Sequence, residues 1–159
     1  MTGTIIAKLI AFDRGDRHRV NHALKVTGYA MAIASGERLS GGDKRILEAA
    51  SILHDIGILP ALEKYGRADG KAQEELGPPE ARKVLASLDW SDGDIRRVEY
   101  LVGHHHSYGM DGGPLLQILF EADFIVNLDE GQFPSQSPVS IRDRYFRTPS
   151  GITVFNALF

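Results

Sequence analysis

The stretch ILEAASILHDIGI, residues 46–58, decides the fold that we expect for this chain. Apolar residues occupy nearly every face of a helix drawn through it, which is typical of a central helix covered by its neighbours. His54 and Asp55 close the run. Because a charged side chain in apolar surroundings needs a counter-ion, this pair predicts a partner of opposite charge, such as a bound cation.

The spacing of apolar residues predicts helices on both sides of this run. Over residues 16–35 they recur at intervals of three and four, and Gly36 follows as a stop. Asp43 is expected to cap the central helix, and Pro60 to end it. Residues 63–77 are charged and contain glycine, so we expect a loop over the surface near the end of the central helix.

Prolines, glycines and capping residues divide the second half of the chain into four further expected helices. In order, these are the segments from Pro78 to Leu88, from Ser91 or Asp92 into the histidine triplet 104–106, from 115 to 128 after Gly112-Gly113-Pro114, and from Thr148-Pro149 to Phe159. Residues 133–140 are rich in Pro and Ser, which predicts a loop. No segment alternates like a strand and no repeat is present, so we expect an all-α, single-domain bundle over residues 1–159.

Composition narrows the classes of function. The chain of 159 residues contains no cysteine, which excludes thiolate catalysis, disulfides and sulfur-ligated zinc. The net charge is −3 with acidic and basic residues mixed, so long nucleic acids are not expected partners. Lys8 interrupts the apolar opening stretch, unlike a signal peptide, and no window approaches the ~20 apolar residues of a spanning helix. We therefore expect a soluble cytoplasmic protein without membrane contact.

Two further histidine positions and one aspartate accompany the His-Asp pair. His22 lies in the first helical segment, the triplet 104–106 comes later, and Asp123 sits inside a second apolar run. His54 and Asp123 each share a helix face with apolar residues, so both should point inward. Neighbours on a helix diverge by ~100°, so His54 and Asp55 can grip one ion only near a helix end. The set predicts a cation cage.

The three histidines of the triplet are expected to differ in how far they point into the core. His105 follows Val98, Leu101 and Val102 at helical spacing, so we expect it to be the most inward of the three. His104 is expected to be second and His106 to point outward.

Each feature alone also has an ordinary structural explanation. A lone His-Asp pair is more often a hydrogen-bonded pair than a metal site. His22 alone would be a surface or packing histidine, and Asp123 alone a partner for an arginine such as Arg19. The triplet alone would be an adventitious metal-binding patch or a hydrogen-bonded network that fixes the tautomers. The four features in this order favour the cation cage.

Four short motifs resemble, in their order along the chain, the successive signatures of the HD superfamily, which is named for the His-Asp pair. The motifs are Arg19-Val-Asn-His22, Ala50-Ser-Ile-Leu-His54-Asp55-Ile-Gly57, Leu101-Val-Gly-His104-His105 and Glu121-Ala-Asp123. The resemblance covers about residues 16–130 and leaves 131–159 as a C-terminal extension. Pieces between residues 63 and 79 further resemble small stand-alone HD proteins that are regarded as phosphohydrolases.

The resemblance implies an HD-type helical bundle that holds a divalent metal ion. The residues that match the ligands of the family are His22, His54, Asp55 and Asp123. In members with two metals, further histidines bind the second ion, and His104 and His105 match the later ones. The histidine that such members place soon after the pair is missing, because residues 56–103 contain none, and Glu74 lies in that region as a substitute. We expect one tightly held ion and a weak or empty second site.

Histidine and carboxylate ligands suit hydrolysis of a phosphoester. They bind Mn, Fe, Co, Ni or Zn and, less well, Mg. A bound ion lowers the pKa of water to about 7 and polarises a phosphoryl oxygen. Besides Asp55, the expected catalytic groups are cations at the mouth of the site and a carboxylate that handles the water or the leaving oxygen. The candidates are Arg19, Lys64, Arg67 and Lys71 for the cations and Glu74 or Glu63 for the carboxylate.

We therefore expect a metal-dependent phosphohydrolase acting on a small phosphorylated substrate, with nucleotides among the candidates. Two alternatives stay open: an HD-type two-iron oxidase, and a non-catalytic module that binds metal and nucleotide to regulate a partner. The apolar C-terminal segment, residues 152–159, either completes the core or contributes to a homodimer.

Overall fold

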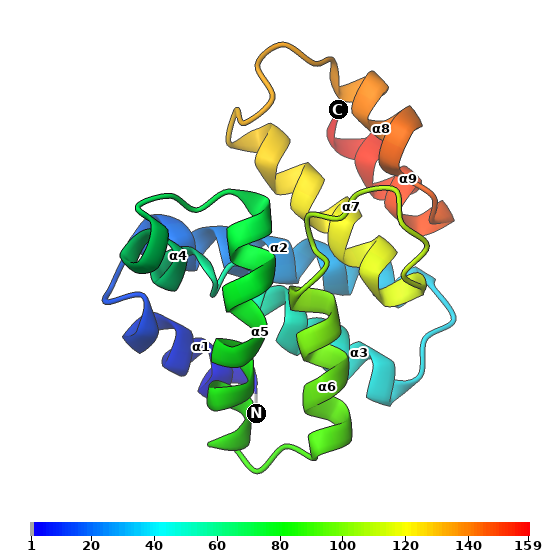
Figure 1. Ribbon diagram of the computed structural model, residues 1–159. Helices are drawn as coiled ribbons and strands as arrows, with labels where there is room; N and C mark the ends of the chain where they lie inside the picture. Colours follow the sequence, from blue (N-terminus) through cyan, green and yellow to red (C-terminus); the bar gives the residue numbers. More distant parts are fainter. Residues whose placement is uncertain (1) are drawn as a thin grey trace.

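The computed structural model describes residues 2–159, which form nine α-helices and no strand (Figure 1). The helices are α1 (Thr2–Phe12), α2 (Arg17–Gly36), α3 (Gly41–Leu53), α4 (Ile58–Tyr65), α5 (Gly70–Ala86), α6 (Asp92–Val102), α7 (Pro114–Asp129), α8 (Pro138–Tyr145) and α9 (Pro149–Leu158). The all-α class predicted from the sequence is confirmed.

Several predicted helix ends are confirmed, and one cap lies elsewhere. The Ser91 side chain caps α6 by accepting from the backbone N–H of Asp94, and Thr148 caps α9 in the same way. The predicted cap of α3 is wrong. Ser40 accepts from the backbone N–H of Asp43 at 3.0 Å, so the helix starts earlier and Asp43 lies in its first turn. A carboxylate is favourable there because the helix dipole is positive at that end.

The predicted surface loop at 63–77 is also wrong, because most of this segment is helical. Asp69 caps α5 through the backbone N–H of Ala72, so the helix begins at Gly70 and continues through Pro78 and Pro79. Pro60 does not end a helix but lies in the first turn of α4, where its missing N–H has no intrahelical partner to lose. The predicted loop at 133–140 likewise ends early, since α8 begins at Pro138.

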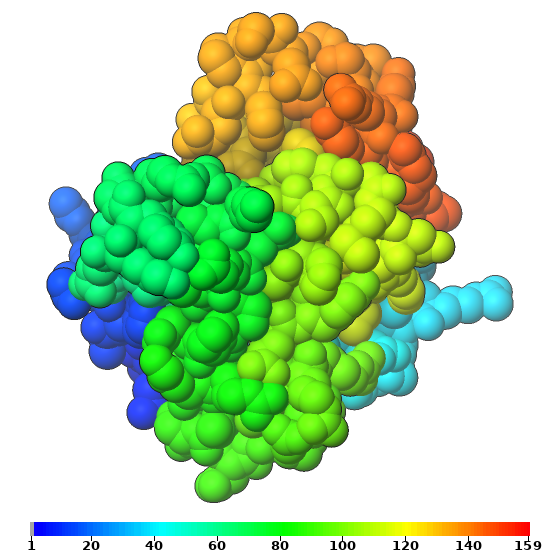
Figure 2. Space-filling model, viewed as in Figure 1, coloured from blue at the N-terminus to red at the C-terminus, as the bar shows by residue number. Residues whose placement is uncertain are grey.

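Helix α3 occupies the centre of the molecule. It packs against α1, α2, α6 and α7, and its apolar side chains from Ile46 to Leu53 are at most 1% exposed. A continuous set of buried apolar side chains extends from α1 to α9. Helices α5 and α6 cover one face of this core, as the green segments of Figure 2 show, and α8 and α9 lie beyond α7.

The C-terminal segment is anchored to α7 by Glu121, which is 0% exposed. Its carboxylate accepts hydrogen bonds from the backbone N–H groups of Arg147 and Thr148 and from the Thr148 hydroxyl. Phe155 of α9 is buried, while Phe159 is half exposed. The segment therefore contributes to the core.

None of the helices in the described residues combines the length and the apolar composition needed to cross a bilayer.

Candidate metal centre

His54 and Asp55 lie just beyond the end of α3, as the sequence predicts. His54 is 0% exposed, and its Nδ1 lies 2.8 Å from the Ser51 carbonyl oxygen. A carbonyl can only accept, so Nδ1 carries the proton and Nε2 presents a lone pair. Gly57 in this turn lies against α5, so closely that a Cβ there would meet the Gln73 carbonyl oxygen at 2.5 Å.

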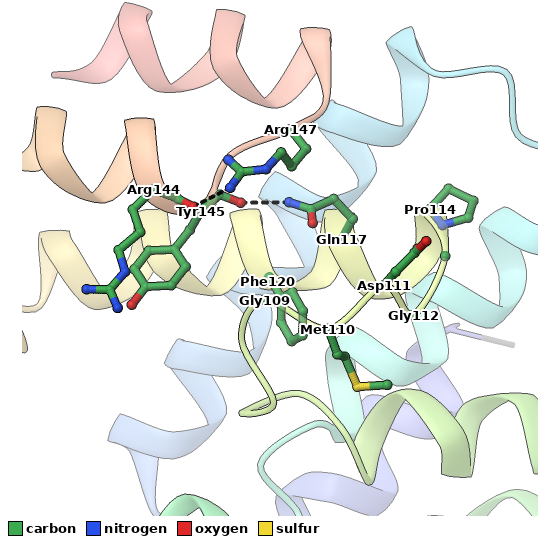
Figure 3. A pocket seen from close by; sticks show the side chains of 11 residues that line it. Gly109, Met110, Asp111, Gly112, Pro114, Gln117, Phe120, Arg144, Tyr145 and Arg147 are labelled. Carbon is green, nitrogen blue, oxygen red and sulfur yellow. Dashed lines mark hydrogen bonds between the residues drawn. The ribbon is translucent and has the colours of Figure 1, made fainter.

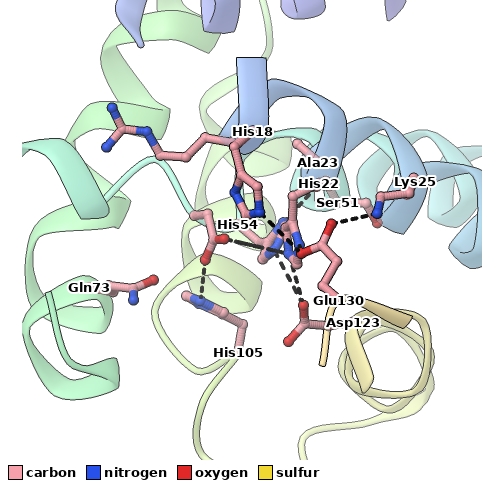
Figure 4. Close-up of polar contacts among 12 residues, drawn as sticks. His18, His22, Ala23, Lys25, Ser51, His54, Gln73, His105, Asp123 and Glu130 are labelled. Carbon is pink, nitrogen blue, oxygen red and sulfur yellow. Dashed lines mark hydrogen bonds and ion pairs between the residues drawn. The ribbon is translucent and has the colours of Figure 1, made fainter. Parts of the chain in front are cut away.

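His22 on α2 faces the same point from the other side (Figure 4). Its Nδ1 lies 2.9 Å from a carboxylate oxygen of Glu130, so Nδ1 again donates and Nε2 presents a lone pair. That Nε2 lies 3.3 Å from Nε2 of His54. Two neutral imidazoles would therefore place lone pairs against each other, an arrangement that only a shared proton or cation makes favourable.

Two carboxylates complete this set of acceptors. Asp123 on α7, 4% exposed, places Oδ1 3.2 Å from Nε2 of His22 and 3.7 Å from Nε2 of His54. Asp55 places Oδ2 3.6 Å and 3.5 Å from the same two nitrogens. Imidazole nitrogens and carboxylate oxygens are ligands that divalent transition metals favour, so the donor set fits such an ion.

His105 extends the cluster on the other side of Asp55. It is 2% exposed, and its Nδ1 donates to the Val102 carbonyl at 2.7 Å. Its Nε2 lies 3.4 Å from Asp55 Oδ1 and is buried without a hydrogen-bond partner among the described residues. Asp55 therefore turns one oxygen toward His22 and His54 and the other toward His105.

The expected order of the other two histidines is reversed. Nδ1 of His104 donates to the Tyr100 carbonyl, and its ring packs against that of Tyr100 with the ring centroids 4.4 Å apart. Neither group of described side chains that could hold an ion includes it. His106 instead lies beside His105, with ring centroids 4.0 Å apart. The reason is that α6 ends at Val102, so the helical period used for the prediction does not apply beyond it.

Both nitrogens of His106 are engaged by neighbours. Gln73 donates its amide N–H to the Ala68 carbonyl, which turns its Oε1 toward His106 Nε2 at 3.2 Å. His106 Nε2 therefore donates, and its Nδ1 accepts from the Tyr108 hydroxyl at 3.0 Å. Burial and the neighbouring His105 lower the pKa of His106 to about 4, which keeps the ring neutral.

Burial and the neighbouring charges act in opposite directions on the pKa values of His54, Asp55 and Asp123. Burial disfavours charge on Asp55 and Asp123, but the histidines outweigh it and hold the pKa of both carboxyls well below the usual range. Burial likewise opposes charge on His54, yet the two carboxylates raise its pKa to about 9. Protons on the histidines thus supply the positive charge that a metal ion would bring.

A cavity of about 230 Å³ opens onto the cluster. Besides His22, Asp55 and Asp123, the residues that line it are His18, Arg19, Ile58, Gln73, His106, Asn127, Glu130 and Gln132. Arg19, which the sequence analysis placed at the mouth, lies here and pairs with Asp13 and Asp16.

The other residues expected at the mouth do not line this cavity. Lys71 is exposed on α5. The remaining charged groups pair elsewhere: Lys64 with Glu75, Arg67 with Asp69, and Glu63 with Arg14. Glu74 accepts from the backbone N–H of His106 and the hydroxyl of Ser107, both at 2.9 Å, and so holds the loop after α6.

Several cavity residues were not expected from the sequence: Asn127, Glu130 and Gln132, together with His18, Ile58 and Gln73. Asn127 and Glu130 follow Asp123 by four and seven residues, which places all three on one face of α7 or its immediate end. That spacing is visible in the sequence. Gln132 lies in the following loop, where no periodicity would indicate it.

A second hollow, of about 400 Å³, lies between the 109–114 loop and the segment 144–147 (Figure 3). It shares no lining residue with the cavity over the cluster. Tyr108 stands between the two, because its ring packs on Phe120 and Tyr145 of the hollow while its hydroxyl bonds His106 of the cavity.

Comparison with known families matches the HD domain over residues 19–128. The chain belongs to the HD-domain family. Searches of curated proteins and of solved structures found no match. The matched residues of this chain include His22, His54, Asp55 and Asp123, while Glu130 and Gln132 lie just beyond the matched range. The matched range also includes both groups of side chains that could hold an ion. One group is His22, His54 and Asp123, and the other is Asp55, His105 and His106.

Proposed function

We propose that this HD-domain protein is a divalent-metal-dependent phosphohydrolase acting on a small phosphoester. One observation carries the proposal: ring nitrogens and carboxylate oxygens, all acceptors, converge below an open cavity whose wall contains a cation. HD domains are generally metal-dependent hydrolases, which supports the same reaction class.

His22, His54, Asp55 and Asp123 are the residues proposed to hold the ion. Mn, Fe, Co, Ni and Zn suit this mixture of imidazole and carboxylate better than Mg does. When bound, the ion supplies a water of lowered pKa and polarises a phosphoryl oxygen. His105, with its unpartnered Nε2 facing Asp55 Oδ1, supports a second and weaker position.

The residues of the cavity then have separate roles. Arg19 offers a permanent positive charge to the phosphoryl group, which carries negative charge as it is transferred. Glu130 and the Ser51 carbonyl hold His22 and His54 in the orientation that keeps Nε2 inward. Neutral His106 faces the cavity, held by Gln73 and Tyr108.

A two-iron oxidase is a second candidate, and the orientation of Asp55 favours it. Each oxygen of this carboxylate faces a different group of potential ligands, as a carboxylate between two ions would. Two equivalents of iron per chain and loss of activity in air would favour the oxidase.

A screen of phosphoesters with defined metals tests the proposal. Protein loaded with Mn²⁺, Co²⁺ or Ni²⁺ should release phosphate from at least one phosphoester, and Asp55→Ala should abolish that release. His104→Ala is the matched control: it removes a neighbouring histidine that stacks on Tyr100, and it should retain activity. Silence of the wild type across the panel would contradict hydrolysis.

A further inference from the structure

The size of the cavity over the cluster limits what can enter it. Its volume is about 230 Å³, whereas pockets for drug-sized ligands typically span roughly 300–1,000 Å³. A phosphate group, its bound ion and water take part of this space. Little room remains for the rest of the substrate, so the part of it that the cavity encloses must be compact.

The chemistry of the wall is that of hydroxyl recognition. Gln73, Asn127 and Gln132 contribute amides, and Ile58 is the only aliphatic side chain among the lining residues. Among residues 2–159, no Phe, Tyr or Trp lines the cavity. An amide both donates and accepts, which matches a hydroxyl group. Nucleobases, in contrast, are usually gripped by stacking on aromatic rings.

The histidine rings of the cavity are not available for a base to stack on. His106 already packs against the His105 ring, and both of its nitrogens are engaged. His18 is 72% exposed at its side chain and stands at the rim. The hollow beside the 109–114 loop is a separate space: it shares no lining residue with this cavity, and Tyr108 contacts residues of both.

Of the three amides, that of Asn127 is best placed to form hydrogen bonds with a substrate. It is half-buried on α7, one turn beyond Asp123, and no hydrogen bond within residues 2–159 engages its side chain. Gln73, by comparison, has its amide group committed to Ala68 and His106. Gln132 is exposed in the loop after α7 and lines the same cavity.

We propose that the phosphoester of this site is the monophosphate of a small polyhydroxy compound, a sugar or polyol of about three to six carbons, rather than a nucleotide. Asn127 and Gln132 contact its hydroxyls, and Arg19 contacts its phosphate. This inference rests on the proposed function, because it assumes that the phosphate end meets the metal cluster.

Phosphonate analogues test the ligand class without turnover, because their C–P bond is not hydrolysed. Three probes are titrated calorimetrically into Mn²⁺-loaded protein: the phosphonate analogue of glycerol 3-phosphate, ethylphosphonate, and the phosphonate analogue of adenosine 5′-monophosphate. The polyol analogue should bind about tenfold more tightly than ethylphosphonate, as expected for one or two added hydrogen bonds. It should also bind more tightly than the adenosine analogue.

Substitutions then assign the hydroxyl contacts. Asn127→Ala should lower the preference for the polyol analogue over ethylphosphonate about threefold or more. Gln132→Ala should lower this preference as well, and the change should not affect folding because the residue is exposed in a loop. Gln136→Ala is the matched control, because this exposed glutamine lies in the same loop and does not line the cavity. It should keep the full preference.

The outcomes separate this inference from the proposed reaction. Tighter binding of the adenosine analogue, equal binding of the polyol analogue and ethylphosphonate, or no binding of any probe would overturn the ligand class. Preferential hydrolysis of nucleotides would also overturn the ligand class, but it would support the proposed phosphohydrolase reaction. Tightest binding of the polyol analogue without hydrolysis of any ester would support the ligand class and contradict the proposed reaction.

Discussion

At the scale of single residues, the inward histidines have their Nδ1 atoms committed to acceptors. Glu130 accepts from His22, the Ser51 carbonyl from His54 and the Val102 carbonyl from His105. Each bond selects the tautomer whose Nε2 is free to coordinate. Of the three acceptors only Glu130 is a side chain, so it is the one that substitution can remove.

Glu130→Ala should therefore weaken metal binding. Loss of a hydrogen-bonding partner of a ligating histidine typically costs about 10–100-fold in metal affinity. Glu130→Gln should retain most of the affinity, because its amide oxygen can still accept from His22. Asp129→Ala is the control, since this exposed neighbour also pairs with Lys25 but does not contact His22. Equal affinities for Mn²⁺ in the Ala variant and the wild type would contradict this role.

The cluster also makes a prediction about pH. Its carboxylates raise the pKa of His54 from its ordinary 6.5 to about 9, despite burial. The folded state thus binds this proton more tightly than the unfolded chain does, which stabilises the metal-free fold fully below pH 6.5 and progressively less as the pH rises through about 9. The melting temperature of the metal-free protein should fall between pH 7 and 10.

The metal-loaded protein provides the comparison for that experiment. An ion in place of the protons removes this source of pH dependence, so its melting temperature should fall less over the same interval. Circular dichroism can follow both forms. Parallel falls in the two forms would show that His54 is not responsible.

At the scale of elements, close packing of the turn after α3 on α5 positions the cavity. Gly57 lies so near α5 that a Cβ would meet the Gln73 carbonyl oxygen at 2.5 Å and the Gly77 nitrogen at 2.9 Å. Both obstacles are backbone atoms, which cannot move aside as a flexible side chain can. The same contact places Gln73 where it orients His106.

Gly57→Ala should destabilise the fold by about 1–3 kcal/mol, the usual cost of forcing a methyl group into a packed interior. The matched control is Gly28→Ala in α2, where an added Cβ meets no atom within 4 Å. That change should be neutral or stabilising, because alanine favours a helix over glycine. Chemical denaturation measures both. Equal stability of Gly57→Ala and wild type would contradict the close contact.

Apolar periodicity predicted some of the helices and missed others. It indicated α2, α3, α6 and α7, whose apolar faces build the core. Helices α1, α4 and α8 and the first half of α5 were not predicted. Helix α4 spans only eight residues, too few for apolar spacing to identify a helix, and α5 begins at the Asp69 cap with few apolar residues in its first half. The His104–His106 order failed because α6 ends before the triplet.

At the scale of the whole molecule, segments far apart in sequence hold the cluster together. Its side chains come from α2, the turn after α3, the loop after α6, and α7. Glu121, two residues before Asp123, receives the N-terminus of α9, and a Cβ on Gly151 would collide with its carboxylate. The motif residues were predictable as a set, but their distances depend on packing that no local pattern encodes.

Elemental analysis of protein purified without chelator tests the central claim most directly. Inward His22, His54, Asp55 and Asp123 should retain at least about one equivalent of a divalent transition metal per chain. Asp123→Ala should lose most of it. His104→Ala should keep it, because the ring that this change removes packs against Tyr100. Only traces of every such metal in the wild type, with none taken up from added Mn²⁺, Ni²⁺ or Zn²⁺, would contradict the metal centre.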